Sequence, residues 1–321
     1  MFAFLRRKKY RLGKRIVIIE NRSKAIKFRI KRIRKIIIEI FQAEPIFSKF
    51  PRLVIILWDT DMKQVASAFN PDIIYVNVAA VTHGGTLFDT RSDTAIYDEL
   101  KPTMIHEMVH LVHYSRNKGL MMYKERYTRQ VLGDIVRLMK TKSFETTIEQ
   151  SSKSLRTTLN VFLSKIWMEG AARFLQNLYV GRLKFDEDNF RRLHAAAESL
   201  VRQAGLAFEL INEALAKNVL IDTNALNKFL QKAEAHLAGF AISESYVIGE
   251  HIFFSIRYFD SNIDDDNLLD MHIYDIVRKY ERLMLKNGYL PVLSLYSGSG
   301  IFDYKRNILT LAHFLKKAQQ N

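Results

Sequence analysis

The sequence predicts an α+β protein in which a small mixed β-sheet and one buried helix precede a larger, all-helical subdomain. Two runs in the first quarter of the chain, Leu53–Trp58 and Ile73–Val78, are rich in β-branched and aromatic residues, as strands are. The turn residues Asn70-Pro71-Asp72 stand just before the second run. From about Pro102 onward the apolar residues recur mostly at helical spacing.

The segment before these strands is expected to be a basic arm followed by a helix. Residues 1–15 are interpreted as the arm, and Arg15–Glu20 as a short strand. From Ser23 on, apolar residues recur every three or four positions, which indicates one face of a helix. These residues are Ile26, Ile30, Ile33, Ile37, Ile40 and Phe41.

Residues 82–95 contain two consecutive glycines and are expected to form a loop. A helix from about Pro102 to about Tyr114 follows, with the proline in its first turn. Further helices are expected near residues 122–140, 144–181, 189–217, 223–238, 243–259, 269–286 and 303–318. The acidic run Asp264–Asn267 lacks the spaced ligands of a calcium loop, and we expect it to cap a helix.

Composition excludes several classes of site. The 321 residues include no cysteine, so a disulfide framework, a thiolate metal site and a cysteine nucleophile are absent. Apolar Met1–Leu5 precedes the basic cluster Arg6–Lys9, the reverse of the order in a secretory signal. No apolar run of about 18 residues occurs. A soluble, cytoplasmic protein is expected.

The net charge of +15 is concentrated near the N-terminus. Residues 1–40 carry 15 Lys and Arg against two acids, a balance of +13, while the rest of the chain carries 34 against 32. Basic residues 6–35 therefore suggest an anionic partner. Nucleic acid and an anionic membrane surface, with Met1–Leu5 as an apolar foot, are both compatible with this pattern.

The sequence His-Glu-Met-Val-His at residues 106–110 predicts a zinc site. Histidines four residues apart share one helix face, about 6 Å apart, so both imidazoles can reach one zinc. Glu107 lies beside that face, where it can accept a proton from a water on the metal. His113 is too far along the axis from His106 to share the metal, and we expect it to pack or to support a ligand.

A third ligand must come from elsewhere in the chain, and Glu169 is the candidate. It is followed by Gly170, Ala171 and Ala172, whose small side chains would let a second helix approach the first closely. A glycine inside a helix costs about 1 kcal/mol, so a packing reason is expected. The alternative is a solvated glutamate on an ordinary amphipathic helix.

The two motifs together, His106–His110 and Trp167–Ala172, resemble those of gluzincin zinc peptidases of the peptidase-MA-like type. The resemblance implies a zincin-like fold, with an α/β subdomain that contains the active-site helix (21–118) and a helical subdomain that carries Glu169 (119–321). The basic arm inferred from the charge is expected to precede them (1–20). It also implies hydrolysis of a peptide or protein substrate, with Zn²⁺ as cofactor. The 58 residues between His110 and Glu169 are more than thermolysin-like enzymes have.

The same resemblance suggests two further roles. An edge strand pairs with the substrate in zincins, so strand 73–78 is expected at the edge, with Asn77 binding the substrate; a plain buried strand is the alternative. Tyr246, in a Tyr-x-x-Gly segment, is expected to stabilise the oxyanion, with His251 as second choice. The rival to an enzyme is a nucleic-acid- or membrane-binding protein with a structural or vestigial zinc site.

Overall fold

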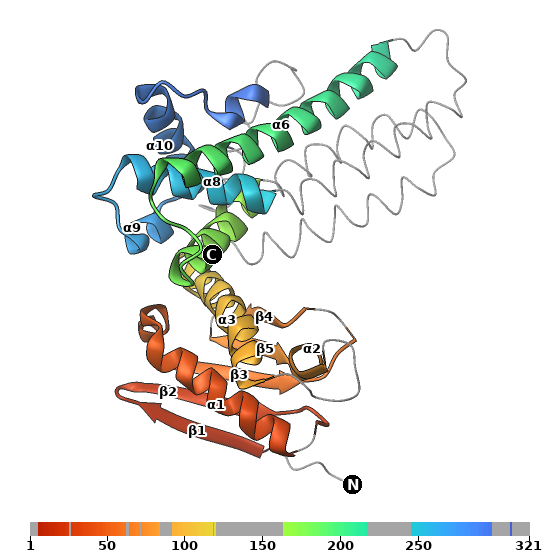
Figure 1. The fold of residues 1–321 in the computed structure, drawn as a ribbon, viewed down its shortest axis with the longest axis vertical. Coiled ribbons are helices and arrows are strands. Elements are labelled where there is room, and N and C mark those ends of the chain that lie inside the picture. Colours follow the sequence, from red (N-terminus) through yellow and green to blue (C-terminus); the bar gives the residue numbers. More distant parts are fainter. Residues whose placement is uncertain are drawn as a thin grey trace. The chain divides into compact units, whose positions relative to one another are not determined.

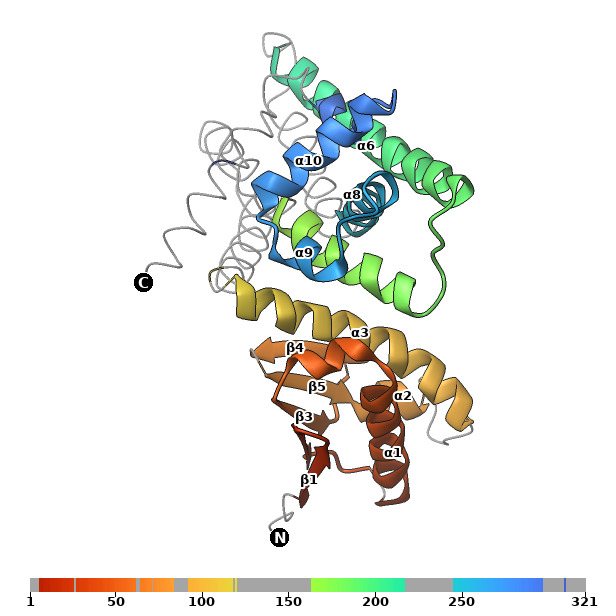
Figure 2. The same cartoon turned by 90° about the vertical axis from the view of Figure 1, so that its left-hand side faces the viewer.

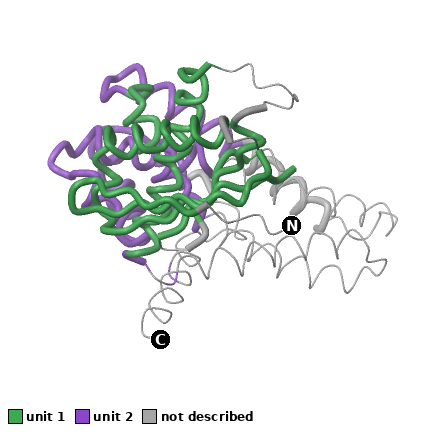
Figure 3. The backbone as a smooth tube through the Cα atoms, turned by 90° about the horizontal axis from the view of Figure 1, so that it is seen from below, with its two compact units in different colours: residues 1–115, 175–183 green, residues 116–174, 184–321 purple. Residues whose placement is uncertain are grey.

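A computed structural model describes most of the chain, in segments. The described residues are 6–25, 27–61, 64–70, 72–83, 92–117, 119, 163–216, 245–296 and 309. The helices expected near 122–140 and 223–238 lie outside them, as do residues 144–162 of the helix expected near 144–181 and all of the helix expected near 303–318 except residue 309. By internal contacts the chain divides into two compact units, residues 1–115 with 175–183, and residues 116–174 with 184–321 (Figure 3).

The first unit is built on a five-stranded mixed sheet (Figure 1). Its strands are β1 (Arg6–Leu12), β2 (Arg15–Asn21), β3 (Arg52–Trp58), β4 (Ala66–Asn70) and β5 (Ile73–Asn77), in the order β1-β2-β3-β5-β4. β2, β3 and β5 run parallel, and both edge strands pair antiparallel with their neighbours. The small mixed sheet that the sequence predicted is therefore present.

Both faces of the sheet carry apolar residues, which explains the continuous apolar runs in its central strands. Ile19 and Ile55 are fully buried, and α1 (Lys27–Ala43) lies along the sheet beside the short helix α2 (Val78–His83) (Figure 2). A second cluster contains Ile18, Val54 and Ile56. The 3₁₀ helix η1 (Pro45–Lys49) connects α1 to β3.

The N-terminal segment differs from its interpretation as an arm. Residues 6–21 form the β1–β2 hairpin, with all seven residues of each strand in register, and Gly13 makes its turn at φ 62°. β1 is an edge strand rich in Lys and Arg. Charged side chains on an edge strand discourage pairing with another chain, so part of the basic charge has a structural use.

α3 (Asp93–Arg116) begins about nine residues before the expected start. Ser92 caps it, since its Oγ accepts a hydrogen bond from Ala95 N at 3.1 Å. Pro102 therefore lies inside the helix and not in its first turn. Thr103 Oγ1 donates to Glu99 O at 3.0 Å, which adds a hydrogen bond next to the turn that the proline leaves incomplete.

The second unit is helical. Its described elements are residues 163–174 of a helix that continues to 179, α6 (Glu187–Ala216), α8 (Ser245–Phe259), α9 (Asp265–Asp270), α10 (Ile273–Lys286) and the 3₁₀ helix η2 (Val292–Tyr296) (Figure 1). The helix expected over 269–286 is two helices, because Met271 ends α9 and His272 caps α10. The α+β class is confirmed.

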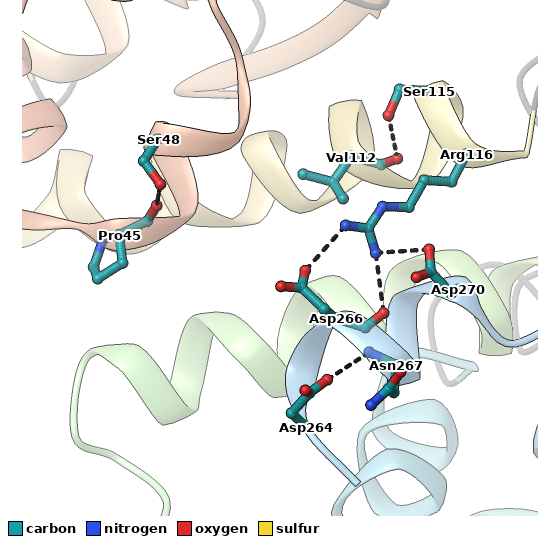
Figure 4. Close-up of polar contacts among 9 residues, drawn as sticks. All are labelled: Pro45, Ser48, Val112, Ser115, Arg116, Asp264, Asp266, Asn267 and Asp270. Carbon is teal, nitrogen blue, oxygen red and sulfur yellow. Dashed lines mark hydrogen bonds and ion pairs between the residues drawn. The ribbon is translucent and has the colours of Figure 1, made fainter. Parts of the chain in front are cut away.

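The acidic run before α9 caps a helix, as expected. Asp264 accepts a hydrogen bond from Asn267 N at 2.7 Å (Figure 4). Arg116 pairs with Asp266 at 3.0 Å and with Asp270 at 2.7 Å in the same view. Arg116 thus neutralises Asp266 and Asp270, and Asp264 serves as the helix cap.

Candidate metal centre

α3 directs two imidazoles at one point. His110 is 2% exposed, His106 is half-buried, and their Nε2 atoms lie 3.0 Å apart. Zinc–nitrogen bonds of about 2.0–2.1 Å at a tetrahedral angle would separate two such nitrogens by about 3.3 Å. The observed separation is close to that value, so the pair fits a single zinc ion.

Gln176 fixes the tautomer of His106. The Nδ1 atom of His106 lies 3.0 Å from Gln176 Oε1. A carbonyl oxygen only accepts, so Nδ1 carries the proton and Nε2 keeps the lone pair that a metal needs. Sequence reasoning missed this residue, although it stands seven positions after Glu169, two turns along the same helix face.

Glu169 is the third member of the group. It is 2% exposed, and single ligand atoms of His106, His110 and Glu169 all lie within 4.8 Å of one another. Glu169 belongs to the continuous helix of residues 163–179, whose Gln176 binds His106. The residues chosen from the sequence therefore make one candidate metal group, with two imidazoles and a carboxylate as donors.

Lys165 pairs with Glu169 one helical turn away. Its Nζ lies 2.8 Å from Glu169 Oε1, and the two side chains are only 8% and 3% exposed. A buried carboxylate requires a charged partner, and Lys165 supplies one. The ion pair is made through Oε1, one of the two carboxylate oxygens of Glu169.

Gly170 has a packing reason, but a different one from that expected. A Cβ built on Gly170 would lie 2.5 Å from the Cα of Gly249, and one on Gly249 would lie 2.6 Å from the Cα of Gly170. The close approach is thus between helix 163–179 and α8, with two glycines facing each other. The small residues beside Glu169 let α8 hold the helix that carries the carboxylate.

Glu107 is positioned by an edge strand. It is 7% exposed, and its Oε2 accepts a hydrogen bond from the backbone N–H of Ala68 in β4 at 2.5 Å. Glu107 follows His106 directly on α3. A backbone donor of β4 therefore fixes the carboxylate of the residue next to a member of the candidate metal group.

The expectation that strand 73–78 forms the edge is wrong, because β5 lies between β3 and β4. The edge beside Glu107 is β4, whose residues Ala66–Asn70 contain no β-branched side chain. Asn77 is 1% exposed, and its amide both accepts from Thr60 N at 3.3 Å and donates to Thr60 O at 3.1 Å. In this structure Asn77 fixes a loop, which is the buried-strand alternative.

Tyr246 lies in the first turn of α8. The Nζ of Lys165, the partner of Glu169, is 5.6 Å from the centre of the Tyr246 ring. A cation over an aromatic face is attracted by the ring, which helps to hold both side chains near Glu169. A role for the Tyr246 hydroxyl stays a prediction.

His251, the second choice for that role, is part of an interior network. It is fully buried, with Nε2 at 3.2 Å from Tyr280 Oη and 3.3 Å from His194 Nδ1, and Nδ1 at 3.3 Å from Ser255 Oγ. Burial, helped by the neighbouring His194, lowers the pKa of His251 to about 3, so the ring is neutral. Both nitrogens have protein partners, which makes it a packing residue.

His113 is also fully buried, in agreement with a packing or supporting role, and does not belong to the metal group.

No family model, curated protein or solved structure matches this chain. In the described part of the chain, no helix has the length and apolar character needed to cross a membrane.

Proposed function

We propose that this protein is a zinc-dependent peptidase of gluzincin type, with His106, His110 and Glu169 as the metal ligands. The observation that carries the proposal is the convergence of these three donors within 4.8 Å. Glu107, which follows His106 in the chain, is also buried. Two imidazoles and one carboxylate are a ligand set typical of catalytic zinc. Three protein ligands leave an open position, whereas structural zinc sites are closed by four.

Glu107 is the proposed general base. When bound, zinc would supply a Lewis acid that polarises a carbonyl and makes a water more acidic. Glu107 would take the proton of the attacking water and deliver it to the leaving amine. Ala68 N–H holds the carboxylate of Glu107 in place for both transfers. Tyr246 would stabilise the developing oxyanion through its hydroxyl.

Among the described residues no strand pairs with the side of β4 that faces away from β5, and this side offers a place for a peptide substrate. Val65 O accepts a hydrogen bond from Asn77 N, so residue 65 faces β5, and by alternation the backbone groups of Ala66 and Ala68 face away from it. Ala68 N–H indeed points to Glu107. An extended peptide added along this side would pass the proposed base. We therefore propose that β4 pairs with the substrate, in place of strand 73–78 with Asn77.

The test is a peptide-library digest with zinc-loaded wild type and Glu107→Gln protein. Glutamine keeps the size and polarity of the side chain but cannot accept the proton, so turnover should fall by at least a thousandfold while zinc binding remains. Glu99→Gln, earlier on α3, is the matched control and should retain activity. Wild-type turnover in Glu107→Gln, or none in the wild type, would contradict the proposal.

A second proposal concerns the basic segment, for which β1 is the specific observation. Arg7, Lys8, Lys9 and Arg11 are exposed on this edge strand. Such a surface would bind phosphates without sequence preference, and its affinity would fall steeply with salt. Co-sedimentation with DNA and with anionic liposomes across a salt series separates the two partners. Binding to neither would leave edge protection as the explanation of the charge.

A further inference from the structure

Arg173 shares a helix face with the proposed metal ligand. It stands four residues after Glu169 and three before Gln176. At 3.6 residues per turn, Arg173 is rotated by about 40° from Glu169 and by about 60° from Gln176. Gly170, which meets α8, lies about 60° to its other side. Arg173 thus stands between the side that meets α8 and the side that carries Glu169.

A buried carboxylate on α8 holds Arg173 by one nitrogen. Nε of Arg173 lies 2.6 Å from Oε2 of Glu250, whose side chain is 4% exposed, while the Arg173 side chain is 41% exposed. Among the described residues, Arg173 Nε makes this one hydrogen bond, and neither Nη nitrogen of Arg173 has a hydrogen bond or an ion pair. The guanidinium is therefore held through Nε by Glu250, on a side chain that is partly exposed.

This arrangement is more than neutralisation of a buried acid. An arginine whose only use is to neutralise Glu250 would be expected to engage it with two nitrogens, as Arg191 and Arg202 engage their glutamates. The planar pair of outer nitrogens matches the two oxygens of a carboxylate. Because Glu250 already orients the plane, little rotational freedom remains to be lost when a ligand binds.

We propose that Arg173 forms a subsite for a carboxylate of the substrate, close to the bond that is cleaved. The inference rests on the proposed peptidase function. Side chains one helical turn apart are about 6 Å from each other, and an extended peptide advances about 3.3 Å per residue. The carboxylate therefore lies within about two residues of the cleaved bond. It is either an acidic side chain or a free C-terminus.

The experiment measures peptide binding to the zinc-loaded Glu107→Gln protein by fluorescence anisotropy. One cleaved sequence is made with Glu or Gln beside the bond, and each with a free or an amidated C-terminus. The peptide whose carboxylate reaches Arg173 should bind about tenfold more tightly than its neutral counterpart. Arg173→Gln should abolish this preference and Arg173→Lys should weaken it, whereas Arg191→Gln on α6 should leave it unchanged.

The outcomes separate the two proposals. Equal loss of binding for neutral and acidic peptides in Arg173→Gln would show a structural role only and overturn the subsite. A preference that survives in Arg173→Gln would also overturn it, although peptide cleavage would stand. Absence of peptide binding and of cleavage in the zinc-loaded wild type would contradict both the carboxylate subsite and the peptidase function. If Arg173→Gln does not fold, the double variant with Glu250→Gln, which removes both charges, replaces it.

Discussion

The contact between Gly170 and Gly249 should control both the stability of the second unit and the geometry of the candidate metal centre. In Gly249→Ala, the new Cβ would stand 2.6 Å from two backbone atoms, Gly170 Cα and Ile166 O. Ordinary contact distances begin near 3.4 Å, so helix 163–179 and α8 must separate by about 1 Å. Neither neighbour is a flexible side chain that could move away.

Overpacking of this kind costs about 1–3 kcal/mol, and contact with backbone favours the upper part of that range. Alanine gains up to about 1 kcal/mol of helix propensity over glycine. We therefore expect the free energy of unfolding to fall by about 2 kcal/mol. A displacement of about 1 Å is also large beside the tolerance of about 0.2 Å in metal–ligand distances, so zinc affinity should fall at least tenfold.

The assays are urea denaturation and competitive zinc titration of the folded variant. Gly181→Ala is the control, because Gly181 follows the same helix at φ 73° with nothing within 4 Å of a new Cβ. It should lose about 1 kcal/mol from backbone strain and keep its zinc affinity. Unchanged stability and zinc affinity in Gly249→Ala would refute the packing argument.

Three further predictions concern the neighbours of the centre and the interior of the second unit. Gln176→Ala should weaken zinc binding about tenfold or more in a chelator competition, with the fold intact, because His106 loses the acceptor that fixes its tautomer. Lys165→Met should destabilise the metal-free protein by about 3 kcal/mol in urea, since Glu169 loses its buried partner, and zinc should restore much of that loss. His251 is neutral in the folded protein, whereas in the unfolded chain it binds a proton below about pH 6.5. The free energy of unfolding should therefore fall as the pH drops from about 6.5 toward 3, by at most about 1.4 kcal/mol per pH unit. His251→Gln should flatten that pH dependence; an unchanged slope would contradict the assignment.

The two histidines of the candidate metal group were accessible to sequence reasoning because local helix geometry determines how they lie. Histidines four apart on a helix must share a face, and the structure brings His106 and His110 to one point. Glu169 was selected for its small neighbours, and it lies with the histidines. The sequence suggested that Gly170 lets its helix approach the helix of His106 and His110. In the structure Gly170 instead faces Gly249 of α8, a contact that no spacing in the sequence reveals.

The sheet edges were harder to predict because their residues are atypical of strands. β4 has the sequence Ala-Ser-Ala-Phe-Asn, with no β-branched residue, and β1 is mostly Lys and Arg. Both are held by pairing with one neighbour, so tertiary context and not propensity decides their conformation. Because strand 73–78 was expected at the edge of the sheet, Asn77 was expected to bind the substrate. In the structure the amide of Asn77 binds the backbone of Thr60.

Gln176 and Arg173 were missed for a related reason. Each acts through a partner distant in sequence, Gln176 through His106 and Arg173 through Glu250. Their positions, seven and four residues after Glu169, place them near its face, and a helical projection of residues 163–179 shows this. The identity of the partners required the fold.

Zinc content measured with a ligand-by-ligand control tests the central claim most directly. The protein is reconstituted with zinc, dialysed and analysed by mass spectrometry for metal, alongside His106→Ala, His110→Ala, Glu169→Ala and the control Glu99→Gln. We expect one zinc per chain in the wild type and in Glu99→Gln, and a loss of affinity of at least tenfold in each of the other three. A wild type without zinc, or a Glu169→Ala protein that holds zinc as tightly as the wild type, would contradict the account.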